Sequence, residues 1–192
     1  METLSKLFGS ENKVKMMRLF LFNPEKVFGA VEVADRIKAE PSKIRKELVN
    51  LEKMNLIKRK AGRVKGGQGF VLDSQFVYME QLANFLINIE PLHPKEIINK
   101  VSKLGSVKLI VIAGVFIQET ESRVDMLVVG DGVKKSALEN VIKLLESEIG
   151  KELKYAQFTT EEFKYRLSMC DKLTRDILDY PHRKVLNKLG NI

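Results

Sequence analysis

The sequence predicts an α+β protein of two domains: three helices and a β-hairpin, followed by a small α/β domain with a mixed sheet. Three observations predict this. Apolar residues recur at helical spacing over residues 13–54, two long apolar runs follow residue 105, and a segment of helical periodicity separates these runs from a third expected strand. The 192 residues are 44% hydrophobic and 30% charged, which is ordinary for a globular protein and excludes a disordered one.

Helical periodicity predicts three helices in the first domain, over residues 13–22, 30–38 and 41–54. Ser10 or Asn12 is placed to cap the first helix, because a side-chain oxygen there accepts from a free backbone N–H. The third helix begins at a proline, which the first turn of a helix tolerates well.

The third helix has one apolar stripe and one polar, basic face. The stripe is formed by Ile44, Leu48 and Leu51. The opposite face offers these side chains: Ser42, Lys43, Arg45, Lys46, Asn50 and Lys53. A helix of this kind fits the major groove of DNA, where Arg or Lys bonds to guanine O6 and N7.

A hairpin of two strands follows over residues 56–72, with its turn in the Gly-Gly-Gln-Gly run at 66–69. Its first strand and turn carry five cations: Lys58, Arg59, Lys60, Arg63 and Lys65. Side chains of this kind would lie along a phosphate backbone or in the minor groove. Three helices followed by a hairpin form the winged helix-turn-helix pattern.

The charge of the chain is concentrated in this domain. Residues 1–73 carry 16 Lys and Arg against 9 Asp and Glu, a net +7, whereas residues 74–192 carry 17 against 16, a net +1. A basic module joined to a nearly neutral one indicates a polyanion binder attached to something else. Double-stranded DNA is the favoured partner, while a winged helix with a structural or protein-binding role, or one that binds RNA, stays open.

The expected domain boundaries are 1–75 for the winged helix, 76–104 for a helical linker and 105–192 for the α/β domain. The linker holds helices over 79–88 and 94–104. In the last domain we expect strands over 107–116, 124–129 and 153–158. Its expected helices span 134–149, with Gly150 as C-cap, a segment after Thr159 or Thr160, and 172–179.

Residues 7–60, LFGSENKVKMMRLFLFNPEKVFGAVEVADRIKAEPSKIRKELVNLEKMNLIKRK, carry a family resemblance. They resemble the winged-helix domains of arsenical-resistance-repressor-like regulators, over a match of about residues 4–75. The nearest subgroup opens with a Leu-Phe-Gly-Ser run and is fused to a minimal nucleotidyltransferase domain. The resemblance implies DNA binding.

Residues 105–170 resemble that minimal nucleotidyltransferase fold, of the DNA polymerase beta-like superfamily. In active members a Gly-Ser turn holds phosphates and a Ser-Asp-x-Asp element holds metal, which neutralises the triphosphate during transfer. Here the turn is Gly114-Val115, Arg123 replaces the first carboxylate, and Asp125 alone remains. The resemblance therefore implies a degenerate nucleotide site with no metal, no cofactor and no catalytic residue, so that an enzyme is disfavoured.

Several residues of this domain allow two interpretations. Asp125 is expected to be a structural carboxylate paired with Arg123 or a lysine. Glu119 and Glu121 are either displaced metal ligands or, as we favour, solvated loop charges. Cys170 is expected to be a small core residue, because it continues the apolar stripe of the preceding helix.

The sequence as a whole predicts a cytoplasmic, DNA-binding transcriptional regulator. Its degenerate domain would serve as a sensor, a dimerisation surface or a platform for a protein partner. The alternatives are a divergent nucleotidyltransferase and an antitoxin-like interaction module. A homodimer is expected, and the apolar stripe of residues 79–89 is the candidate dimer surface. The alternative is that this stripe packs on the winged helix of its own chain. No apolar run approaches the roughly 18 residues of a membrane span, so no membrane partner is expected.

Overall fold

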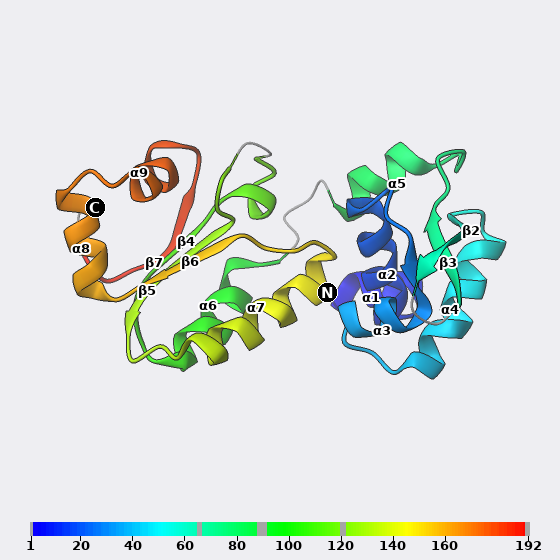
Figure 1. Cartoon of the computed structure of the whole chain (residues 1–192), viewed down its shortest axis with the longest axis horizontal. Helices are drawn as coiled ribbons and strands as arrows, with labels where there is room; N and C mark the ends of the chain where they lie inside the picture. The colour runs from blue at the N-terminus through cyan, green and yellow to red at the C-terminus, as the bar shows by residue number, and fades with distance from the viewer. Residues whose placement is uncertain (1, 65–66, 88–91, 120–121, 191–192) are drawn as a thin grey trace. The chain divides into compact units, whose positions relative to one another are not determined.

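The computed structural model of the chain describes residues 2–64, 67–87, 92–119 and 122–190. Helices and two separate sheets make up these residues, which confirms the α+β class (Figure 1). Contacts divide the chain into two compact units, Met1–Ile89 with Glu146–Lys151 and Glu90–Leu145 with Glu152–Ile192. The segment 76–104 that we expected as a linker is shared between the units, since its first helix lies in one and its second in the other.

The first unit is mainly helical. Its helices are α1 (Glu2–Phe8), α2 (Glu11–Phe22), α3 (Ala30–Arg36), α4 (Pro41–Lys53) and α5 (Met79–Leu86). The three helices predicted before residue 55 are confirmed as α2, α3 and α4, with ends within two residues of the prediction. Ser10 rather than Asn12 caps α2, because its Oγ accepts from the Lys13 N–H at 3.3 Å. Helix α1 was not predicted.

A three-stranded antiparallel sheet completes this unit. Its strands are β1 (Phe28–Gly29), β2 (Ile57–Val64) and β3 (Gly67–Leu72), in the order β1-β3-β2. The predicted hairpin is confirmed as β2 and β3, and the two-residue strand β1 adds a third member. Gly69 is required where the hairpin passes the chain before β1, because a Cβ there would overlap the Val27 side chain.

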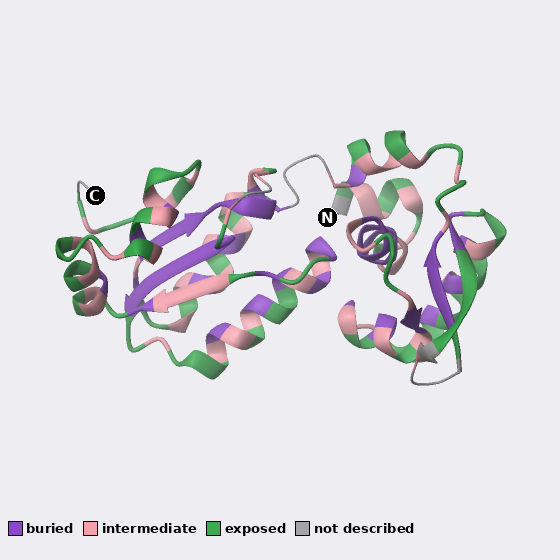
Figure 2. Cartoon of the chain, turned by 45° about the horizontal axis from the view of Figure 1, so that its top comes forward, coloured by how far each residue is buried: buried purple, intermediate pink, exposed green. Residues whose placement is uncertain are grey.

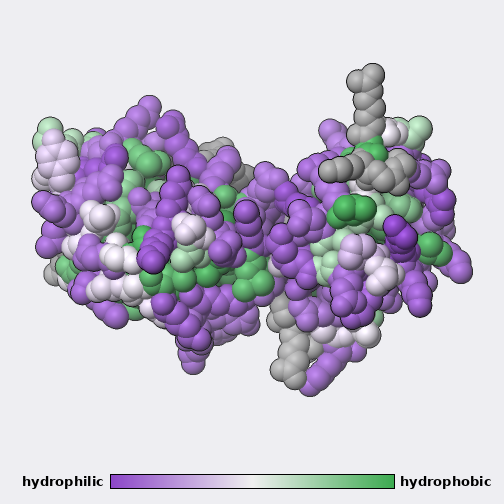
Figure 3. Space-filling model, turned by 60° about the horizontal axis from the view of Figure 1, so that its bottom comes forward, coloured by the Kyte–Doolittle hydropathy of each residue, from purple (hydrophilic) through white to green (hydrophobic). Residues whose placement is uncertain are grey.

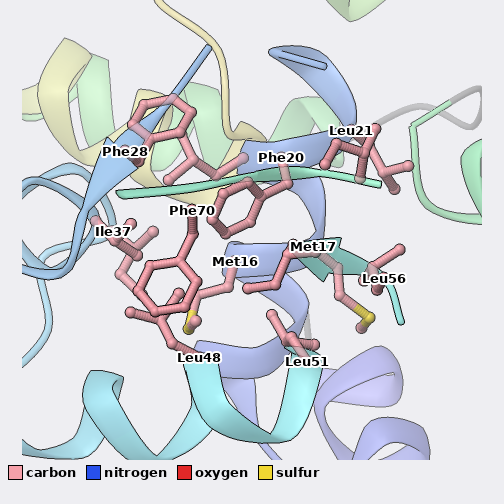
Figure 4. Packing of buried hydrophobic residues seen from close by; sticks show 14 of the residues in the cluster. Met16, Met17, Phe20, Leu21, Phe28, Ile37, Leu48, Leu51, Leu56 and Phe70 are labelled. Carbon is pink, nitrogen blue, oxygen red and sulfur yellow. The ribbon is translucent and has the colours of Figure 1, made fainter. Parts of the chain in front are cut away.

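One hydrophobic core joins the helices to this sheet. The stripe predicted for α4, Ile44, Leu48 and Leu51, is fully buried in it. Phe20 and Phe28 meet edge to face with ring centroids 5.6 Å apart, a favourable aromatic geometry (Figure 4). This core fixes the orientation of α4, so that its other face is turned toward solvent.

Helix α5 packs on the core of its own unit. Leu86 is fully buried there, and Leu82 is packed against it. The buried Arg18 of α2 donates from Nε to the Leu86 carbonyl at 3.0 Å, which holds the end of α5 against α2. Of the apolar stripe proposed as a dimer surface, Phe85 stays exposed, and Ile89 lies outside the described residues.

The second unit contains a sheet of mixed strand direction, as the sequence predicts, but with four strands where three were expected. Its strands are β4 (Ser106–Ile112), β5 (Met126–Asp131), β6 (Tyr155–Phe158) and β7 (Arg183–Asn187), in the order β6-β5-β4-β7. Strands β5 and β6 are parallel and the other pairs antiparallel. Strand β7 was not predicted. The expectation of one strand over 107–116 was wrong at its end, because the chain leaves the sheet after Ile112 and forms a 3-10 turn over Gly114–Phe116.

Four α-helices of the described residues cover this sheet: α6 (Pro94–Val101), α7 (Lys135–Ile149), α8 (Thr160–Ser168) and α9 (Lys172–Asp179). Phe163 of α8 and Ile177 of α9 pack on one face, and α6 and α7 lie on the other (Figure 1). Thr159 caps α8 by accepting from the Glu162 N–H at 3.1 Å. Gly150 follows α7 with φ +92°, the left-handed conformation expected of a glycine after a helix.

Burial varies across the second sheet and over the surface. The inner strands β4 and β5 are buried along most of their length, while the edge strand β6 is largely half-buried (Figure 2). Hydrophilic residues dominate the face shown in Figure 3, with small apolar groups between them. No helix within the described ranges is long and apolar enough to cross a membrane.

Candidate functional site

Helix α4 presents a continuous polar and basic surface. Because Ile44, Leu48 and Leu51 anchor one face in the core, the residues between them point outward. The predicted contact residues of this helix are all exposed: Ser42, Lys43, Arg45, Lys46 and Asn50. The helix therefore brings together on one surface every α4 residue that the sequence singled out.

The cations of α4 differ in how they are held. Lys43 pairs with Glu40 at 3.0 Å, but both side chains are about two-thirds exposed, so the pair is weak. Within the described part of the chain, no ion pair or hydrogen bond engages the exposed side chains of Arg45 and Lys46. An anion could therefore bind these two side chains without displacing a carboxylate from them.

Arg59 of the hairpin is held by its own unit. Its Nε donates to Glu52 Oε1 at 2.7 Å and its Nη1 donates to Gln68 Oε1 at 2.8 Å. Its guanidinium also lies 5.7 Å from the centroid of the Phe70 ring. Arg59 thus ties the hairpin to the end of α4, a partnership that sequence reasoning missed, and it would have to exchange partners to contact a phosphate.

The remaining hairpin cations fall into three groups. Lys58 pairs with Asp73 at 3.0 Å, and this hydrogen bond is the main cause that lowers the pKa of the Asp73 carboxyl below its ordinary value. Lys60 is exposed. Lys65 lies outside the described residues, as does the side chain of Arg63, so their expected phosphate contacts rest on the sequence alone.

The second group of singled-out residues surrounds Asp125, just before β5. Its carboxylate is buried and accepts two backbone bonds, from Val115 N at 2.9 Å and from Lys154 N at 2.8 Å. Gly114 has φ +54°, and a Cβ there would overlap Asp125 Oδ1. Asp125 therefore joins the turn after β4 to the chain entering β6.

The expected pairing of Asp125 with Arg123 is not what the structure shows. Arg123 instead places Nη1 3.0 Å from Oδ2 of Asp176 on α9. Arg123 is well exposed and Asp176 is mostly buried, so the pair clips α9 to the loop before β5. The groups that bind the Asp125 carboxylate are backbone amides, and the pattern of charges in the sequence does not reveal them.

The described residues contain no cluster of three or more His, Cys, Asp or Glu side chains that could hold a metal ion. Asp125 has a backbone donor on each oxygen, and the neighbouring strand β6, Tyr155–Phe158, contains no carboxylate residue. Glu119 lies in the described loop, and Glu121 falls outside the described residues. The hydrogen bonds of Asp125 connect the turn at Val115 to the chain at Lys154, which is a structural role.

Sequence reasoning also missed a hollow of about 640 Å³ where the parallel strands β5 and β6 end. Its wall includes the starts of α7 and α8, with Lys135 and Thr159. The carboxylate of Asp131 already binds at the start of α8. Thr160 donates to Asp131 from N at 3.0 Å and from Oγ1 at 2.7 Å, and these bonds lower the pKa of the Asp131 carboxyl.

The expectation that Cys170 is a core residue was wrong. Helix α8 ends at Ser168, and Cys170 takes a left-handed backbone with φ +51° that turns it out of the apolar stripe. Its thiol side chain is exposed.

Comparison with protein-family models, with curated proteins and with solved structures gave no match for this chain.

Proposed function

We propose that the protein is a cytoplasmic, sequence-specific DNA-binding transcriptional regulator whose first unit acts as a winged helix-turn-helix. The observation that carries this is the exposed face of α4. Arg45 and Lys46 lie on it beside the short polar side chains of Ser42 and Asn50, while the opposite face is locked into the core. A rigid helix with unengaged cations on its outer face is what base readout in the major groove requires.

The hairpin has the complementary role in this proposal. Lys60 lies on β2, and Arg63 and Lys65 extend the basic sequence toward the turn. Contacts from these residues would reach phosphates and fix the register of α4 without reading bases. Arg59 contributes less than its charge implies, because a phosphate would have to displace Glu52 from its guanidinium.

The second unit serves, in this proposal, as a degenerate nucleotidyltransferase-like domain that senses, dimerises or binds a protein partner. The buried carboxylate of Asp125 accepts a hydrogen bond from a backbone amide on each oxygen, which supports a role without metal or catalysis. We further propose a homodimer, since paired modules match two-fold operators. The candidates for the dimer surface are three exposed apolar side chains of the first unit, Val77, Tyr78 and Phe85.

The test of DNA binding is selection from a pool of random duplexes by the full chain, followed by titration of selected and unselected duplexes by fluorescence anisotropy. Selected sites should bind at least about a thousandfold more tightly than random ones. With about six phosphates neutralised, log affinity should fall against log salt with a slope near −5. A chain that selects no sequence, or binds with no salt dependence, is not such a regulator.

A further inference from the structure

An apolar pocket of about 310 Å³ opens in the first unit, and none of the residues proposed to contact DNA lines it. Its lining comes from α1, α2, the end of α4, the start of the hairpin, the loop after β3 and α5: Leu7, Phe8, Lys13, Met17, Met54, Leu56, Phe76 and Leu82. Seven of these eight side chains are apolar. The volume is at the lower end of the range for small-molecule sites, which are concave, mostly apolar and equipped with few polar groups.

The pocket has a fixed floor and an open rim. Met17 and Leu56 are almost fully buried and lie side by side in the core (Figure 4). Leu7 and Met54, by contrast, are 66% and 47% exposed. A ligand can therefore enter between side chains that are free to move and rest on side chains that are not.

Lys13 is the single charged residue in the described lining. Its Nζ lies 3.9 Å from Glu47 Oε2, at the limit of an ion pair. That carboxylate oxygen is buried and accepts no hydrogen bond from the described residues. Lys13 is therefore weakly engaged, and its ammonium has hydrogen-bond donors left for a second carboxylate.

We propose that this pocket binds a small amphipathic carboxylate, with its apolar body on Met17 and Leu56 and its anionic head at Lys13. At about 30 Å³ for each water-sized volume, the space holds roughly ten non-hydrogen atoms. A straight-chain acid of eight carbons, or an aromatic acid of similar size, has that number. The single cation selects an acid over an alcohol or an amine of the same length.

The pocket is placed to regulate the proposed DNA contact, and this part of the inference rests on the proposed function. Met54 is the C-cap residue of α4, and Leu56 immediately precedes β2. An occupant would press on the junction between the helix proposed to read bases and the hairpin proposed to contact phosphates. A change in DNA affinity caused by the acid implies an equal change in acid affinity caused by DNA.

The test uses the full chain labelled with ¹³C in its methionine methyl groups and octanoate as the probe, below its micellar concentration. Octanoate should shift the Met17 and Met54 signals saturably and leave those of Met126 and Met169, in the second unit, unchanged. Octanol and octylammonium are the uncharged and oppositely charged controls and should bind at least about tenfold more weakly. Shifts of similar size with all three probes, or at all methionines, would overturn the proposal.

Three variants sharpen the test. Lys13→Met should weaken octanoate binding by about tenfold, as expected for a hydrogen bond between charged groups, and leave octanol binding unchanged. Glu47→Gln removes the competing carboxylate and should tighten octanoate binding by about two- to fivefold, the range for a partly exposed ion pair. Leu7→Trp changes an exposed side chain, so the fold should be kept while the pocket entrance is blocked and octanoate binding is lost.

Two further outcomes separate this inference from others. If raising the protein concentration without octanoate shifts the Met17 and Met54 signals and prevents octanoate from shifting them further, a second copy of the chain covers the pocket and the proposal is wrong. If octanoate binds as described while no duplex binds in the presence or absence of octanoate, the pocket stands and the proposed DNA function fails.

Discussion

Replacing Asp125 by alanine should strongly destabilise the second unit. The buried carboxylate accepts from two backbone amides, at 2.9 and 2.8 Å, and each such bond to a charged group contributes about 1.5–3 kcal/mol. The loss should therefore be about 3–6 kcal/mol, a large share of the roughly 5–15 kcal/mol that stabilises a typical protein. Asp125→Asn keeps the shape and one acceptor oxygen, so it should cost about half as much.

Urea unfolding followed by tyrosine fluorescence measures this directly. Tyr155, Tyr165 and Tyr180 lie in the second unit and Tyr78 in the first, and the chain has no tryptophan. Asp179→Ala is the matched control, because its exposed pair with Arg175 should contribute no more than about 0.5 kcal/mol. A cost below about 1 kcal/mol for Asp125→Ala would refute the structural role. Magnesium that stabilised the wild type but not Asp125→Asn would show the carboxylate to be a metal ligand.

Three further outcomes are expected. Stability should fall on acidification below about pH 4, because hydrogen bonds lower the folded-state pKa of Asp131 and Asp171. The stability that these two carboxylates contribute is complete above their unfolded pKa of about 3.9 and is lost as the pH falls through the folded value. Asp131→Asn should therefore make stability fall less steeply with decreasing pH, and an unchanged slope would contradict this. With magnesium or manganese and labelled nucleoside triphosphates the protein should transfer no nucleotide, and transfer that disappears in Asp125→Asn would overturn the degenerate interpretation. Light scattering should give about twice the chain mass of 21.9 kDa, with Phe85→Glu reducing it to one chain, whereas a wild-type monomer at high concentration would remove the dimer.

The elements that the sequence predicted well are those with strong local signals. Helices α2, α3 and α4 have apolar stripes at helical spacing, and the N-cap of α2 and the proline that opens α4 mark where they start. The hairpin is marked by its glycine turn. In these segments the residues that form the structure are neighbours in the chain, so periodicity and capping suffice to locate them.

The missed strands depend on distant partners. Strand β7 is mostly exposed and only five residues long, and it becomes a strand by pairing with β4, over seventy residues earlier in the chain. Strand β1 has two residues and exists because β3 lies beside it. The apolar run after residue 105 has the same composition in the strand and in the buried turn at Gly114, so hydrophobicity alone could not place the end of β4.

The site residues divide in the same way. The outward face of α4 follows from its buried stripe, so the exposure of Arg45 and Lys46 could be predicted from the sequence. The partners of Asp125 could not, because they are amides 10 and 29 residues away that only the folded sheet brings to it. The bond from Arg59 to Glu52 likewise connects two elements and changes which hairpin cation is available to a partner.

The central claim is that the outer face of α4 contacts DNA, and a charge-matched titration tests it most directly. The full-length double variant Arg45→Glu with Lys46→Glu is compared with Lys164→Glu with Lys172→Glu, whose side chains are exposed on α8 and α9. Each pair lowers the net charge by four, from +8 to +4, so a general charge effect is the same in both. We predict that the α4 variant loses at least about a hundredfold in anisotropy-measured affinity for a selected duplex, while the control loses less than about tenfold. Equal losses in the two variants would contradict the claim and leave the first unit as a module for protein contacts.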